Sequence, residues 1–178
     1  MNQNLVLTVI SADRPGVVQQ LAKTIHDNHG NWLESRMSHL AGKFAGILQV
    51  AVPEEHCESL LAALGGLACD GLQVVAEKAE GVGEAQPVAL SFSVVGPDRT
   101  GIVYEVSQAF ASRSISVDEL ETDTSSMPWS GEPMFEATGI IHLPNGVNMD
   151  ELYDQLDAIA DELAVDIRLE ELPESQTA

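Results

Sequence analysis

The chain is poor in basic residues and in aromatics. Its 178 residues include 8 Lys or Arg against 28 Asp or Glu, which gives a formal net charge of −20 at pH 7. Such a surface repels phosphate backbones and anionic lipid headgroups, so we expect no direct nucleic-acid binding and no membrane binding. Aromatic residues make up 4% of the chain, too few for the exposed stacking platform of an RNA-recognition module. A basic partner protein fits this surface better.

Cysteines and long apolar runs are also scarce. Cys57 and Cys69 are the only cysteines and do not form a C-x-x-C pair, so we expect two small apolar residues and no disulfide framework. No run approaches the roughly 20 apolar residues that a membrane helix needs. The opening MNQN lacks the basic start of a secretory signal. We therefore expect a cytoplasmic protein, and no motif calls for a cofactor.

One short motif occurs twice. SADRPGVV (residues 11–18) and GPDRTGIV (residues 96–103) share Asp, Arg and Gly at a constant offset of 85 residues. Each motif follows an apolar, strand-like run and precedes a run of apolar residues at helical spacing. Self-similarity of this kind predicts two copies of one structural unit.

The apolar patterns predict the order β-α-β-β-α-β in both copies. The expected elements are 5–10, 17–25, 31–40, 44–52, 60–67 and 72–76 in the first copy, and 88–95, 102–110, 116–124, 134–143, 152–163 and 165–169 in the second. This order predicts an α+β fold of two ferredoxin-like units, each a four-stranded antiparallel sheet with its helices on one face. The expected domains are 1–77 and 87–172, with a polar linker at 78–86 and a frayed tail at 173–178.

The repeated turn has a structural interpretation. Pro15 suits the first turn of a helix, where its missing N–H costs nothing, and Thr100 in the matching place could cap with its hydroxyl. Asp13 and Asp98 suit the positive end of the helix dipole. In this interpretation the turn only starts a helix.

The glycines favour a functional interpretation of the same turn. Gly16 and Gly101, placed inside the first helical turn, would each cost about 1 kcal/mol relative to alanine. A bare backbone there would let a carboxylate or phosphate approach the helix N-terminus, and Arg14 and Arg99 could add a guanidinium. We expect Gly16→Val to damage ligand binding more than folding.

The motif D-R-x-G-[IV]-V, placed between the first strand and first helix of such a unit, resembles that of the ACT domain. Tandem copies over about residues 4–172 resemble the glycine cleavage system transcriptional repressor family. The segment MPWSGEPMF (residues 127–135) is similar to the S-G-x-P-[LM]-F segment that this family carries before the third strand of its second ACT domain.

The resemblance implies a small amino-acid ligand, bound where two ACT units meet. It implies roles for the turn and for the start of the second strand, where the Asn31 amide can both donate to a carboxylate and accept from an ammonium, and Ser116 is a weaker substitute. With the two arginines, the candidate ligand-binding residues are Asp13, Arg14, Pro15, Gly16 and Asn31 in copy one and Asp98, Arg99, Thr100, Gly101 and Ser116 in copy two.

The resemblance also implies a regulator without catalytic activity. Glycine or a similar amino acid would change the affinity for a partner such as a DNA-binding activator, and ACT–ACT contacts could form a homo-oligomer. The chain has no G-x-S-x-G elbow and no P-loop. Two alternatives stay open: a detached regulatory subunit of an amino-acid or one-carbon enzyme, and an interaction scaffold that binds no ligand.

Three further features have two interpretations each. His26 and His29 share a helical face, but no third ligand stands at helical spacing, so we expect no metal site. The stripe of Asp150, Asp154, Asp157 and Asp161 predicts a solvated helix face or a docking face for a basic protein. The loop from Ser125 to Pro133 is the main difference between the copies, and it is expected to fold back on the core or to form a contact surface or lid.

Overall fold

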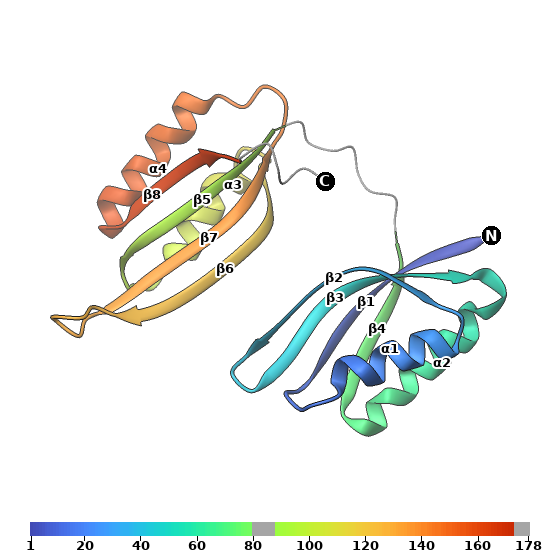
Figure 1. Ribbon diagram of the computed structural model, residues 1–178. Helices are drawn as coiled ribbons and strands as arrows, with labels where there is room; N and C mark the ends of the chain where they lie inside the picture. Colours follow the sequence, from blue (N-terminus) through green and yellow to red (C-terminus); the bar gives the residue numbers. More distant parts are fainter. Residues whose placement is uncertain (80–87, 173–178) are drawn as a thin grey trace. The chain divides into compact units, whose positions relative to one another are not determined.

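The computed structural model describes residues 1–79 and 88–172. The chain forms two compact units, Met1–Val82 and Gly83–Ala178 (Figure 1). The predicted tail at 173–178 and all but the first two residues of the predicted linker lie outside the described residues, so the domain boundaries stay a prediction.

The first unit has the predicted element order, with two short 3-10 segments beside its second helix. Its elements are β1 (Asn2–Ala12), α1 (Val17–Asp27), β2 (Asn31–Leu40), β3 (Lys43–Pro53), η1 (Glu54–His56), α2 (Cys57–Gly66), η2 (Leu67–Asp70) and β4 (Leu72–Lys78). The four strands form one sheet in the order β2-β3-β1-β4, and every neighbouring pair is antiparallel.

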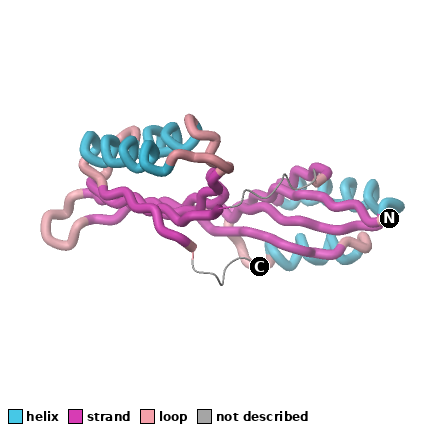
Figure 2. Tube along the Cα trace, turned by 90° about the horizontal axis from the view of Figure 1, so that it is seen from above, coloured by secondary structure: helices cyan, strands magenta, loops and turns pink. Residues whose placement is uncertain are grey.

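The second unit repeats this architecture. Its elements are β5 (Val88–Pro97), α3 (Ile102–Ala111), β6 (Ser116–Ser126), β7 (Pro133–Leu143), α4 (Met149–Leu163) and β8 (Asp166–Glu171). The strand order is β6-β7-β5-β8, and Figure 2 shows its two helices on one side of the sheet. The prediction of two β-α-β-β-α-β units of α+β class is confirmed.

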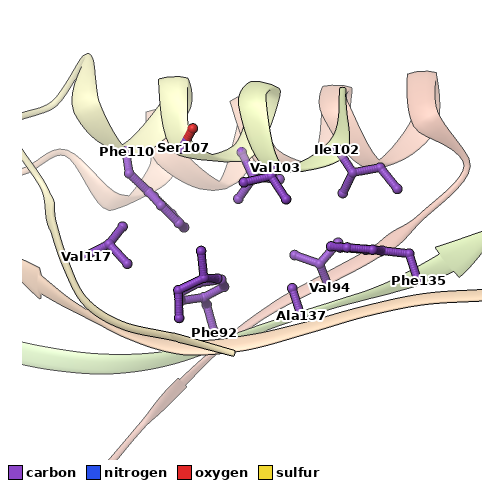
Figure 3. A pocket seen from close by; sticks show the side chains of 11 residues that line it. Phe92, Val94, Ile102, Val103, Ser107, Phe110, Val117, Phe135 and Ala137 are labelled. Carbon is purple, nitrogen blue, oxygen red and sulfur yellow. The ribbon is translucent and has the colours of Figure 1, made fainter. Parts of the chain in front are cut away.

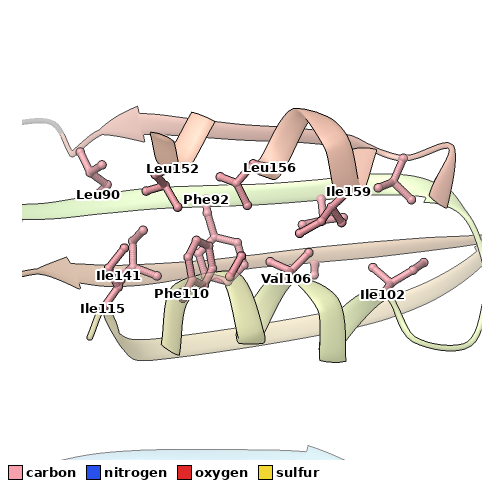
Figure 4. Close-up of a cluster of buried hydrophobic side chains, with 14 of the residues drawn as sticks. Leu90, Phe92, Ile102, Val106, Phe110, Ile115, Ile141, Leu152, Leu156 and Ile159 are labelled. Atoms are coloured by element: carbon pink, nitrogen blue, oxygen red, sulfur yellow. The ribbon is translucent and has the colours of Figure 1, made fainter. Parts of the chain in front are cut away.

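Alternation along the strands explains why one face of each sheet takes the helices. In β1, Leu5, Leu7 and Val9 are at most 1% exposed, whereas Thr8 and Ile10 between and beyond them point to the other face. The helices contribute apolar stripes at helical spacing to the same core. The core of the second unit is built likewise, and it includes an edge-to-face contact between Phe92 and Phe110 with ring centroids 5.3 Å apart (Figure 4).

The acidic stripe lies on the exposed side of α4, opposite the buried Leu152, Leu156 and Ile159. Asn148 starts this helix, and its side chain accepts hydrogen bonds from the N–H groups of Asp150 and Glu151. Such a cap satisfies donors that the helix leaves without partners. The stripe is exposed, which both of its interpretations require.

Candidate functional site

The repeated turn ends in both units with a glycine in the left-handed backbone region. Gly16 has φ +89° and Gly101 has φ +99°, and they are the N-caps of α1 and α3. A Cβ added at Gly101 would meet nothing within 4 Å, and at Gly16 only Gln19 Oε1 at 3.9 Å. The backbone conformation, rather than crowding, therefore requires glycine. The expectation that both glycines lie inside the first helical turn is wrong.

Neither turn caps its helix with a side chain. Thr100 does not cap, and Pro15 precedes the N-cap instead of occupying the first turn, because both helices begin one residue after the glycine. The first helical hydrogen bond runs from Gln20 N–H to Gly16 O at 2.9 Å, and the second unit has the same bond at the same length. The N–H groups that precede it have no acceptor within the helix, which makes them donors for an anion.

Arg14 is held by the structure around it. Its guanidinium donates to Gln20 Oε1 at 2.9 Å and to the Asp70 carbonyl at 3.0 Å. The Gln20 amide donates in turn to Asp70 Oδ2 at 2.8 Å. These bonds join the β1–α1 turn to η2, which gives Arg14 a structural role.

Arg99 differs from Arg14. Within the described residues it makes no hydrogen bond and no ion pair. The position that matches Gln20 holds Glu105, a residue without an amide to complete such a network. Of the two arginines, Arg99 is thus the one with its guanidinium donors available.

Each turn is fastened to the tip of the following hairpin. Asp13 N–H donates to Gly42 O at 3.0 Å, and Asp98 N–H donates to Pro133 O at 2.9 Å. In the first unit this brings His39 Nε2 to 3.4 Å from Asp13 Oδ2, with both side chains about half exposed. The sequence analysis did not select His39. The only signal was topological: in this strand order the β2–β3 tip lies at the end of β1.

The loop between β6 and β7 closes on itself. Met127 N–H donates to Glu132 O at 2.9 Å, and Gly131 N–H donates to Met127 O at 3.0 Å. Trp129 at its tip is 99% exposed. The expectation that this loop folds back on the core is therefore wrong. The loop instead lies beside the Asp98 turn, through the hydrogen bond to Pro133.

Asn31 lies at the opposite end of the sheet from the turn. It pairs with Ala51, which pairs with Asn4 of β1. Asn4 is eight residues before Ala12, the last residue of the strand, so about 27 Å separates the two ends. One unit therefore does not bring Asn31 and Asp13 together.

The second unit separates its candidates in the same way. Ser116 pairs with His142, which pairs with Ala89 of β5. Ala89 is also eight residues before Pro97, the end of that strand. In both copies, the turn residues are neighbours and the residue at the start of the second strand is about 27 Å away.

An apolar cavity lies between α3 and the sheet of the second unit (Figure 3). Its volume is about 30 Å³, comparable to a single water molecule. Ser107 supplies the only polar side chain of its lining, and no residue of the Asp98 turn contributes. This cavity is too small and too apolar for a zwitterionic amino acid.

The described residues contain neither a metal-binding cluster nor a membrane-spanning helix. In residues 1–79 and 88–172, no group of three or more His, Cys, Asp or Glu side chains is placed to hold a metal ion. The His29 ring instead lies against His56, with centroids 4.2 Å apart. No helix within these ranges is long and apolar enough to cross a membrane.

Residues 3–75 match the sequence model of the ACT domain. These residues make up most of the first unit, which is therefore similar to an ACT domain. The second unit has the same element order, strand order and turn, so the two units share one ACT-like fold. No curated protein is detectably similar in sequence.

Two solved structures share the tandem fold along nearly the whole chain. An unknown protein from Galdieria sulphuraria is 29% identical, with a TM-score of 0.82 over 97% of this chain and 100% of that one. A protein described as a proposed glycine cleavage system transcriptional repressor is 20% identical, with a TM-score of 0.69 over 98% of this chain and 99% of that one. The second likeness is one of fold.

Proposed function

We propose that this tandem ACT protein is a cytoplasmic, non-catalytic regulator that binds glycine or a similarly small amino acid. Binding would control its affinity for a partner protein through which it represses transcription. The observation that carries the proposal is the left-handed, uncapped glycine turn, which is present at the first helix of both units.

The turn offers complementary groups to a zwitterion. The N–H groups at the start of α1 or α3, with the positive end of the helix dipole, suit the ligand carboxylate. Asp13 or Asp98 suits the ligand ammonium through a charge-assisted hydrogen bond. The space next to Gly16 and Gly101 is open, because a Cβ there would meet nothing closer than 3.9 Å.

A second ACT unit would complete the site. Asn31 lies about 27 Å from the turn of its own unit, so an amino acid of a few ångströms cannot contact both. An Asn31 amide supplied by another unit could meet the turn, and Ser116 could act likewise. The ligand would then stabilise one arrangement of two units. Its binding would thereby change the surface that a partner protein recognises.

The partner is proposed to be a basic protein, such as a transcriptional activator. The −20 charge of the chain disfavours direct DNA binding and favours a basic protein surface. The similarity to the proposed glycine cleavage repressor supports the same role. The exposed acidic stripe of α4 is a suitable docking face, because no Lys or Arg on that helix offsets it.

Calorimetric titration of the full chain with single amino acids tests the proposal. We expect glycine or another small amino acid to bind, and Asp98→Asn to weaken it at least about tenfold through loss of a charged hydrogen bond. Asp118→Asn, a neutralisation on exposed β6, is the matched control and should leave the affinity unchanged. Absence of heat with every small amino acid would overturn the proposed function.

A further inference from the structure

The sheet of the first unit has one face covered by α1 and α2 and one open face (Figure 1). On the open face, Ile47 of β3 and Val75 of β4 flank Thr8 of β1 on its two sides. Ile10, Ile47 and Val75 are 43%, 52% and 59% exposed. With Val6 and Ala45, these residues lie around Thr8 on the same face of the sheet, and we call them the open-face patch. Patches of this kind mark interaction sites.

The second unit shows that the fold does not require this patch. By strand register, Thr138 takes the place of Ile47, and Arg168 takes the place of Val75. Ser93 takes the place of the central Thr8, and it pairs with both Thr138 and Arg168. A sheet of the same order therefore forms with polar residues at these positions. Apolar residues at these positions are therefore not required for the sheet to form.

The outward faces of the two sheets, those not covered by helices, also differ in charge. In the first unit the outward charged side chains are two acids and two bases, Glu34, Glu77, Arg36 and Lys43, and Arg36 pairs with Glu34 at 3.5 Å. In the second unit the outward charges are Glu119, Glu121, Asp123, Glu136, Asp166 and Glu170 against Arg168. A second copy of a −20 chain is repelled by the second face and is not repelled by the first.

The open face is large enough for a stable interface. Its strands have 11, 10, 11 and 7 residues, a mean length of about 33 Å, and four strands at a spacing of about 4.8 Å give a width of about 19 Å. The product, about 630 Å² on each side, lies at the lower end of the roughly 600–1,000 Å² per partner of specific protein interfaces. Two sheets packed face to face also interdigitate outward side chains such as Ile47 and Val75.

We propose that two copies of this chain associate through the open face of the first unit, sheet against sheet. A twofold axis brings a patch onto its own copy, so a single apolar, charge-balanced surface is sufficient for a closed dimer.

Sedimentation equilibrium of the full chain without amino acid, from about 1 to about 100 µM, tests the proposal. We expect a dimer. The variant Ile47→Thr/Val75→Arg carries the residues of the second unit, and it should raise the dissociation constant about 100-fold or more because each change occurs on both sides of the axis. A melting curve verifies that this variant is folded.

The control is Val95→Thr/Ile140→Thr, at two apolar residues on the outward face of the second unit, where Val95 pairs with Glu136 and Ile140 with Ser91. It removes apolar surface from that face and should leave the dimer unchanged. A monomeric wild type at 100 µM would overturn the proposal, as would a dimer that survives the Ile47/Val75 variant. Loss of the dimer in this control alone would place the interface on the outward face of the second unit. Calorimetric failure with amino acids would leave these results standing.

Discussion

Arg14 donates a hydrogen bond to the main-chain carbonyl of Asp70 at 3.0 Å, across 56 positions of the chain. The bond ties the first turn of the unit to the segment that leads into its last strand. Because the acceptor is a main-chain atom, the contact does not depend on the Asp70 side chain. Only the bond from the Gln20 amide needs that carboxylate.

We expect Arg14→Met to lower the free energy of unfolding of the first unit by about 1 kcal/mol, since two exposed hydrogen bonds are lost. Asp70→Ala should cost less, because it removes one of the bonds of the network. Arg99→Met in the second unit is the matched control and should have almost no effect. Urea unfolding of the three variants measures this, and equal losses for Arg14→Met and Arg99→Met would contradict the structural role of Arg14.

Gly16→Val should destabilise the protein by about 1–2 kcal/mol, because a β-branched residue is strained at φ +89°. This reverses the sequence-based expectation that the variant spares folding. Gly16→Asn should cost clearly less, since Asn tolerates the left-handed region. Thermal unfolding compares the two, and similar melting temperatures would mean that the turn relaxes to negative φ.

Arg99→Gln should weaken amino-acid binding about tenfold, the effect of one charged hydrogen bond, while leaving the melting temperature unchanged. The reason is that this guanidinium has no partner among the described residues to lose. Calorimetry beside a melting curve separates the two effects. Unchanged affinity would remove Arg99 from the proposed site.

The isolated protein should show no duplex DNA binding at physiological salt. A surface of charge −20 gains no counterion release from DNA. An electrophoretic mobility assay measures this. A shifted band that weakens as salt is added would contradict the prediction and the partner-mediated mechanism with it.

Trp129 should behave as a free indole in water. In a Trp32→Phe variant, its emission should match that of free tryptophan and be fully quenched by acrylamide, because its side chain is 99% exposed. Trp32, which packs against the core, should remain protected in the reciprocal Trp129→Phe variant. A blue-shifted, protected Trp129 would mean that something covers the β6–β7 loop.

The fold could be predicted because the spacing of apolar residues along the sequence identifies each strand and helix. Alternation in β1 and the helical spacing of Val17, Leu21 and Ile25 each select an element and its buried face. The repeat then fixes the order of both units at once. Element order and type therefore needed no long-range information.

The site was less predictable, for reasons that are geometric. The sequence does not distinguish a glycine that precedes a helix from a glycine inside its first turn. The left-handed φ of Gly16 shows that it precedes α1. The contact of Arg14 with Asp70 depends on where η2 packs. The distance between Asn31 and the turn depends on how the strands pair and run, and the motif residues alone do not specify this.

The hairpin tip of the second unit has a consequence for engineering. Up to β6, matching residues of the two copies differ by 85 positions, as in Arg36 and Glu121, whereas in β7 they differ by 91, as in Ile47 and Thr138. The second unit thus has six more residues at this tip than the first, with the same strand pairing on either side. The tip is a natural insertion point, where an epitope tag or a fluorescent reporter could be spliced into the chain while both sheets keep their register.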